Sequence, residues 1–282
     1  ALSANFKEQQ IPENVGISGT LNFTEQPTVT YLPLQGNDFI QQLLAPISLD
    51  TIILLVNSGW SIERILRLTV QSMNGIPNAP TASGPTPTTE PEYKEFLSIV
   101  NLMRTLQNEG AIQLAYSASG DDKTATLLLP EQTNKTGNTL RQKLKLDSHE
   151  SYQLLSGAGN RYDGQSIIIS TRSLLGVMYY LSHATDVPEQ DKQAGKVTIT
   201  YQKSGTEFNW SDLTQNLFRI KSNTDLSDQN ITIATNYRGN WFYIDDTDLE
   251  SKTTFSLLTQ LFSLQSGKAE GITPVLTLPI GQ

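Results

Sequence analysis

The sequence predicts an α+β protein, with a mainly helical N-terminal part followed by a mixed β-sheet with packed helices. Three observations carry this prediction. Apolar residues recur at helical spacing in several segments before residue 75, and again over 92–107. Apolar and polar residues alternate over 111–116, 123–129 and 197–202, as is typical of half-buried strands. Residues 230–264 predict two strands, a tight turn and a helix, and we take this unit as a core element.

The composition is typical of a folded chain with a neutral-polar surface. Its 282 residues can bury a core as one large domain or as two smaller ones. The net charge of -8 argues against nucleic-acid binding, because phosphate contacts need clustered lysine and arginine. The chain has no cysteine and two histidines, which excludes disulfides, thiolate nucleophiles, cysteine-ligated metals and multi-histidine sites. No metal or cofactor is therefore expected.

The first 75 residues are predicted to form a flexible tether and a helix-rich part. Residues 1–19 are polar and contain proline and glycine, which is typical of a tether. The helix-rich part, residues 20–75, begins with short alternating strands over 20–23 and 28–32. Three helices follow. They are expected to begin at residue 37 or 38, after the capping residue Ser48 and after the capping residue Ser61, with the third extending through Met73.

Residues 76–91 hold five prolines and are the best candidate for a domain boundary, as a linker or a long surface loop. The α+β part follows over residues 92–268, and residues 269–282 are predicted to be a C-terminal tail. The expected elements of the α+β part are a helix over 92–107, a hairpin of strands over 111–116 and 123–129, a strand over 140–146, a loop over 147–165, a strand over 166–170, a helix over 172–182 and a strand over 197–202.

Four carboxylates cluster after the second strand of the 230–264 unit. Asp245, Asp246, Asp248 and Glu250 have the oxygen ligands that Ca²⁺ or Mg²⁺ prefers, but they do not follow the EF-hand pattern. The residues 247–250, Thr-Asp-Leu-Glu, fit a capping box, and acidic residues at a helix N-terminus complement the helix dipole. Capping is the favoured interpretation.

Two further features of the sequence bear on nucleotide binding and on catalysis. Residues 159–166 have the glycine spacing of a phosphate-binding loop, but Gln165 replaces the required lysine and a strand follows where a helix must begin. We therefore reject nucleotide binding. No Gly-x-Ser-x-Gly motif is present, and nothing local supports a triad built on His149 or His183. No catalytic residue is assigned.

The strand expected over 140–146 carries Arg141, Lys143 and Lys145 on one face. This pattern is typical of the solvent face of an edge strand, where lysine discourages pairing between edges. Contact with an anionic partner or with lipid headgroups is the alternative.

The candidate binding residues are two arginines, two aromatic residues and two carboxylates. They are Arg172, Arg238, Trp241, Tyr243, Asp245 and Asp246. Each arginine lies at a junction between predicted elements, so ion pairing with Asp245 or Asp246 is the expected role and ligand binding the alternative.

Three segments carry a resemblance to a known group of proteins. Residues 57–64, 168–182 and 237–246 resemble segments of uncharacterised cell-envelope lipoproteins of Gram-negative bacteria. The resemblance implies a periplasmic protein, anchored by lipid on a cysteine upstream of Ala1, whose membrane contact is limited to that anchor. No apolar run in the chain reaches the roughly 18 residues that span a bilayer. The resemblance brings no catalytic residue with it.

The favoured function is that of a non-enzymatic envelope protein that binds another envelope protein, as an adaptor or an assembly component. One alternative is an envelope hydrolase of glycan or ester bonds, with carboxylates or His149 and His183 in a cleft and a sugar groove lined by Trp60, Trp210 and Trp241. Core and interface roles are favoured for these aromatic residues. The other alternative is a small-ligand binding module that uses Trp241 and Tyr243.

Overall fold

The computed structural model describes most of the chain, in two units. The described residues are 28–31, 37–119, 122–157, 163–227, 230–266 and 276–279. The terminal unit comprises residues 1–33 and 272–282, and the main unit comprises residues 34–271. The predicted tether at 1–19 and the predicted strand at 20–23 lie outside the described residues.

The terminal unit contains two short antiparallel strands in its described part. Strand β1 (Thr28–Tyr31) pairs with β11 (Leu276–Pro279), with Thr28 opposite Pro279. The first of these confirms the strand predicted over 28–32. The second lies within the stretch predicted as the C-terminal tail.

The main unit is α+β, as predicted, and its larger sheet has the strand order β3-β2-β7-β6-β5-β4. Its strands are β2 (Val70–Met73), β3 (Ile76–Pro77), β4 (Gln113–Ser119), β5 (Asp122–Leu128), β6 (Ser151–Ser156) and β7 (Ser166–Thr171). Strands β6 and β7 run parallel, and the other neighbours are antiparallel, so the sheet is mixed. The predicted hairpin is confirmed, with Ser119 opposite Asp122.

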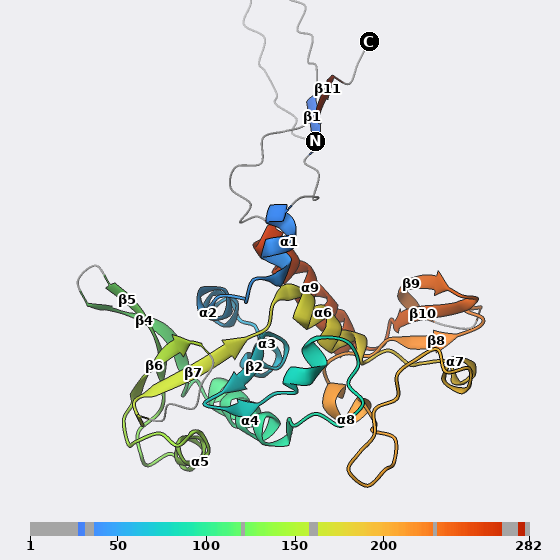
Figure 1. Cartoon of the computed structure of the whole chain (residues 1–282). Coiled ribbons are helices and arrows are strands. Elements are labelled where there is room, and N and C mark those ends of the chain that lie inside the picture. Colours follow the sequence, from blue (N-terminus) through green and yellow to red (C-terminus); the bar gives the residue numbers. More distant parts are fainter. Residues whose placement is uncertain are drawn as a thin grey trace, which may run out of the picture. The chain divides into compact units, whose positions relative to one another are not determined.

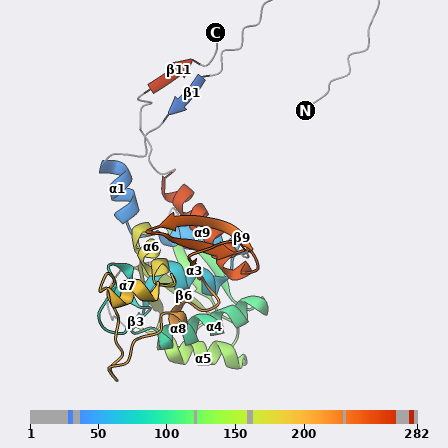
Figure 2. The ribbon, with the colours of Figure 1, turned by 90° about the vertical axis from the view of Figure 1, so that its right-hand side faces the viewer.

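Figure 1 shows the helices of the main unit, of which some pack against this sheet and others lie away from it. They are α1 (Asn37–Leu44), α2 (Leu49–Asn57), α3 (Ile62–Thr69), the 3-10 helix η1 (Pro80–Ser83), α4 (Lys94–Asn108), α5 (Lys135–Leu144), α6 (Leu174–Ser182), α7 (Glu189–Gln193), α8 (Ser211–Thr214) and α9 (Leu249–Ser266). The predicted caps of α2 and α3 form, because Ser48 accepts from the Thr51 N–H and Ser61 from the Arg64 N–H. Helix α5 lies alongside α4 (Figure 2).

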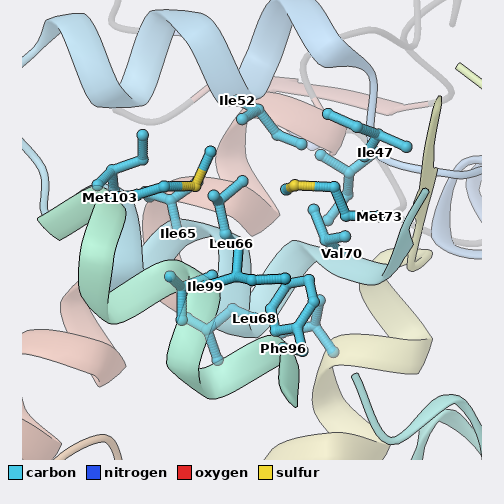
Figure 3. Packing of buried hydrophobic residues seen from close by; sticks show 14 of the residues in the cluster. Ile47, Ile52, Ile65, Leu66, Leu68, Val70, Met73, Phe96, Ile99 and Met103 are labelled. Atoms are coloured by element: carbon cyan, nitrogen blue, oxygen red, sulfur yellow. The ribbon is translucent and has the colours of Figure 1, made fainter. Parts of the chain in front are cut away.

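The core of the main unit is densely packed where α3, α4 and β2 meet, and the predicted core unit contributes Ile244, Leu257 and Leu261 to the same cluster. Figure 3 shows Ile65 and Leu66 of α3 packed with Phe96 and Ile99 of α4. The predicted core unit, residues 230–264, forms its strands and helix as expected, but its first strand is almost wholly exposed. The prediction of a core unit therefore holds for its second strand and for α9 and fails for its first strand.

A second, three-stranded sheet contains that exposed strand. It consists of β8 (Lys221–Asn223), β9 (Ile231–Tyr237) and β10 (Asn240–Asp245), in the order β8-β10-β9. All its strands are antiparallel. In Figure 1 this small sheet lies to one side of the main unit, away from the hairpin of β4 and β5.

The third predicted helix is shorter than expected, and this is a correction. It ends at Thr69, and the chain continues as β2 through Met73. Asn74 and Gly75 both have positive φ, 48° and 73°, and join β2 to β3 by a two-residue turn. Asn-Gly is the preferred sequence for a turn of this kind, so β2 and β3 form a hairpin.

The strand predicted over 140–146 is wrong, because residues 140–144 belong to α5, which ends at Leu144. Asn134 caps this helix by accepting from the Gly137 N–H at 2.8 Å. Leu140 and Leu144 are both buried, at the spacing of one helical turn. Arg141, predicted on a solvent face, is 4% exposed.

Two smaller predictions also fail. Residues 197–202 form no strand, and within them Tyr201 makes isolated bridges to Thr89 and Glu207. The predicted loop over 147–165 contains β6, in which Tyr152 and Leu154 alternate inward. The Pro-rich residues 76–91 hold β3 and η1 within the main unit, and the domain boundaries predicted there stay predictions.

Replacing Lys145 with glycine is expected to stabilise the fold by up to about 1 kcal/mol. Lys145 ends α5 with φ 56°, a left-handed conformation in which a Cβ is unfavourable. Thermal unfolding of the two proteins would measure the gain. Lys145→Ala is the control, since it removes the side chain but keeps the Cβ, and equal stability of the two variants would contradict the backbone explanation.

Candidate functional site

Arg172, the first candidate binding residue, is a structural residue of the core. It is 0% exposed. Its guanidinium donates to the backbone carbonyls of Arg67 at 2.8 Å, Leu68 at 3.1 Å, Val70 at 2.7 Å and Asn78, and to the Ser83 hydroxyl at 2.9 Å. No carboxylate partner is seen in the described part of the chain. The expected ion pair with Asp245 or Asp246 does not form.

The position of Arg172 explains why a buried cation is stable without a carboxylate. The carbonyls of Arg67 and Leu68 belong to the last turn of α3, where carbonyls have no partner within the helix and the helix dipole is negative. The guanidinium also lies over the ring of Tyr180, 4.2 Å from its centroid. Burial lowers the pKa of Arg172 to about 10, so the group stays protonated at neutral pH.

The structure brings three of the candidate residues together on β10. Trp241 and Tyr243 occupy alternate positions of this strand and so share a face of the sheet, and Asp245 follows an irregularity in the register between Ile244 and Asp245. Tyr243 is 5% exposed, so its ring packs into the protein rather than standing free for a ligand.

The two neighbouring carboxylates are engaged in ion pairs. Asp245 accepts from the Lys221 Nζ at 2.8 Å, and Asp246 accepts from the Lys252 Nζ at 2.7 Å. The Lys221 bond, followed by that from Thr247, holds the pKa of Asp245 well below its usual range. The Lys252 bond, followed by that from Thr232, lowers the pKa of Asp246. No group of three potential metal ligands is seen among the described residues.

The predicted capping role of this acidic segment is correct, although the register differs by one residue. Asp248 caps α9, accepting from the backbone N–H of Ser251 at 3.0 Å and from its hydroxyl at 2.6 Å. Glu250, predicted to complete the box, instead pairs with Arg64 of α3.

Arg238 lies in the turn between β9 and β10, at the tip of the small sheet. Arg238 and Gly239 have φ of 51° and 81°, as a two-residue type I′ turn requires. The Arg238 guanidinium lies 5.1 Å from the ring centroid of Tyr237. Among the described residues, Arg238 makes no contact with Arg172, Asp245 or Asp246.

Strand β9 presents an open edge, a feature that the sequence prediction did not include. In the described part of the chain β9 pairs with β10 alone. Six of its seven residues are exposed, among them Ile233 at 44% and Tyr237 at 58%. The strand has no charged residue and no proline.

A cleft of about 810 Å³ is the second feature that the prediction missed. Its walls come from the segments 182–187, 197–200 and 207–219 and from the start of α9. His183 and Trp210 lie in it as a stacked pair, with ring centroids 4.0 Å apart and planes 11° apart. Phe208 meets Trp210 edge to face at 5.1 Å. Most of these segments are irregular, so no periodic pattern marks them in the sequence.

Neither His149 nor His183 contacts both a serine and an aspartate side chain among the described residues, so neither forms a catalytic triad there. The ring of His183 bonds to the Ala82 carbonyl through Nε2 at 3.2 Å, and burial lowers the pKa of this histidine. His149 is exposed, and its ring contacts that of Tyr152.

No protein-family model, curated protein or solved structure matches this chain. In the part of the chain that the structure describes, no helix combines the length and the apolar character needed to cross a bilayer.

Proposed function

We propose that this chain is a non-enzymatic protein-binding component of the bacterial cell envelope, which takes up an extended segment of another envelope protein along the open edge of β9. The observation that carries the proposal is the exposure of this edge. A strand edge offers a row of backbone donors and acceptors, and an added strand satisfies them.

The edge lacks the features that normally prevent pairing between strands. Natural edge strands carry lysine or proline, or are very short. Strand β8, at the other edge of the small sheet, has three residues, whereas β9 has seven uncharged ones. Five of the seven residues of β9, two isoleucines, two threonines and one tyrosine, favour strands. These properties suit an uncharged partner segment with β-branched or aromatic residues at alternate positions.

The turn fixes which backbone groups of β9 face outward. In a two-residue hairpin the pair that flanks the turn, Tyr237 and Asn240, exchanges hydrogen bonds within the sheet. Hydrogen-bonded and non-hydrogen-bonded pairs then alternate along the ladder. The N–H and C=O of Asn236 and Ala234 therefore point away from β10, toward an incoming strand.

Replacing Ala234 with proline is expected to abolish complex formation while the sheet stays intact. Proline removes the outward N–H of residue 234 and places a ring where the partner strand would lie, but it breaks no bond to β10. Ala234→Val is the matched control, because it keeps the N–H and favours strands. The measurement is the size of the complex that each protein forms in its own cells, after gentle extraction, on a native gel.

The proline variant should migrate as the free chain, and the valine variant should keep the wild-type complex. Thermal unfolding of both purified variants shows that the fold is retained. Identical complexes for the two variants, or no complex for the wild-type protein, would contradict binding at this edge.

The proposal also places the protein on the periplasmic side of the envelope, held by an N-terminal lipid. The resemblance of residues 57–64, 168–182 and 237–246 to envelope lipoproteins supports this location. Intact mass of the native protein, together with cell fractionation, tests it. A mass that includes a lipidated cysteine, in the membrane fraction, is the expected result, and an unmodified soluble protein would contradict it.

A further inference from the structure

The cleft has the size of a ligand site and lies outside the β9 edge. Its volume of about 810 Å³ falls in the range of roughly 300–1,000 Å³ that is usual for small-molecule pockets. Its walls combine aromatic rings with hydroxyl and amide side chains. Three of these polar residues, Thr185, Thr198 and Asn216, have no side-chain hydrogen bond to the described part of the chain.

The stacked pair at the cleft offers one acceptor and one donor. A carbonyl oxygen only accepts, so the Nε2 of His183 carries the proton in its bond to the Ala82 carbonyl. The ring is neutral at pH 7, since burial lowers its pKa, and Nδ1 is left with a lone pair. The Nε1–H of Trp210 is a donor. Neither Nδ1 nor this N–H has a hydrogen-bond partner among the residues that the structure describes.

The charged groups of the cleft are already bound to one another or to the protein. Lys192 pairs with Glu207, and Arg219 pairs with Asp186. The two other carboxylates, those of Asp248 and Glu250, bind Ser251 and Arg64. An anionic ligand would have to displace a carboxylate from Lys192 or Arg219, whereas a neutral ligand would not. The cleft is lined by four carboxylates and two cations, and this excess of negative charge repels an anion.

We infer that this cleft binds a neutral oligosaccharide, with hydroxyl groups donating to His183 Nδ1 and accepting from Trp210 Nε1. A hydroxyl both donates and accepts, so neighbouring hydroxyls of a sugar match this pair of groups. The apolar face of a sugar ring can pack on the aromatic wall, and the free hydroxyl and amide groups of the cleft bind the remaining hydroxyls. This inference is independent of the protein binding proposed for β9.

The test is calorimetric titration of the whole chain with two uncharged probes, cellotriose and triacetylchitotriose. At least one probe is expected to bind saturably, with a dissociation constant in the millimolar range or below. Two variants identify the site. His183→Gln keeps an amide N–H for the Ala82 carbonyl and replaces the Nδ1 acceptor by an amide oxygen at a different position, and Trp210→Phe keeps an aromatic ring and removes the N–H donor.

Each variant is expected to weaken the binding of that probe by about tenfold or more. The matched controls are His149→Gln and Trp241→Phe, which replace a histidine and a tryptophan outside the cleft and should bind like the wild-type chain. Circular dichroism melting of every variant separates loss of binding from loss of fold. If His183→Gln unfolds, Thr198→Val gives the same test at a residue with no hydrogen bond to lose.

Three results would overturn the inference. The first is no saturable binding of either probe at millimolar concentration. The second is binding that the cleft variants leave unchanged. The third is binding of the cation spermidine, lost in Glu207→Gln, in place of either sugar. None of these results bears on the β9 edge, because Ala234 lies outside the cleft.

Discussion

Replacing Arg172 with methionine is expected to lower the free energy of unfolding by at least about 4 kcal/mol. Methionine fills much of the volume of the arginine side chain but donates no hydrogen bond. Four buried carbonyls and the hydroxyl of Ser83 would each lose a donor. The C-terminal end of α3 would also lose the cation that complements its dipole. Urea unfolding at neutral pH measures the loss.

Arg172→Lys is the control for charge alone. An ammonium keeps the positive charge but cannot reach the five acceptors with the planar guanidinium geometry, so most of the loss should remain. A loss below about 1 kcal/mol in the methionine variant would contradict the structural role, because unpaired buried carbonyls cost more than that. Wild-type stability of the Arg172→Lys variant would show that the end of α3 requires a positive charge and not the planar geometry of the guanidinium.

Replacing Arg141 with methionine is expected to cost about 3 kcal/mol. This guanidinium is buried and donates to the carbonyls of Pro130 and His149 and to the Tyr152 hydroxyl. It therefore connects α5 to the segments on both sides of that helix. The same measurement, urea unfolding, applies.

The matched control for Arg141 is Lys143→Met, on the same helix. Lys143 is only partly buried, and its replacement should change stability by less than about 0.5 kcal/mol. Similar effects of the two substitutions would support the solvent-facing basic row that the sequence predicted. A much larger loss of stability for Arg141→Met than for Lys143→Met would confirm that Arg141 is buried and Lys143 is not.

The elements that the sequence predicted correctly are those bounded by a capping residue or by a turn sequence. Ser48 and Ser61 cap the helices that were expected to follow them, and Asn236 to Asn240 contain the expected turn. The helix expected to extend through Met73 is wrong because a strong turn signal follows it directly. Asn74-Gly75 is a strong hairpin sequence, and it ends β2 inside the stretch that apolar spacing assigned to a helix.

The failure at residues 140–146 has a different cause. Leu140, Leu144 and Leu146 fit an alternating strand, but the first two also fit one turn of a helix. The cap that decides between them, Asn134, lies upstream of this segment in the sequence. Arg141 then occupies a buried position that the strand pattern assigned to solvent.

The role of Arg172 and the position of the cleft depend on contacts distant in sequence. The carbonyls that bind Arg172 lie about a hundred residues earlier in the chain, and no spacing rule connects them. His183 and Trp210 lie in irregular segments that become neighbours only through the fold. Each of the two residues is a candidate for chemistry on its own, but no pattern in the sequence pairs them.

Site-specific photo-crosslinking from β9 tests the central claim most directly. A photoreactive phenylalanine analogue replaces Tyr237, which is 58% exposed on β9, and in a control protein replaces Tyr201, which is 48% exposed outside that strand. After irradiation of the native cells, Tyr237 should give one discrete product whose crosslinked peptide maps to an extended segment of another envelope protein. Ala234→Pro should remove that product. No product from position 237, the same product from position 201, or a crosslink to a second copy of this chain would contradict the account.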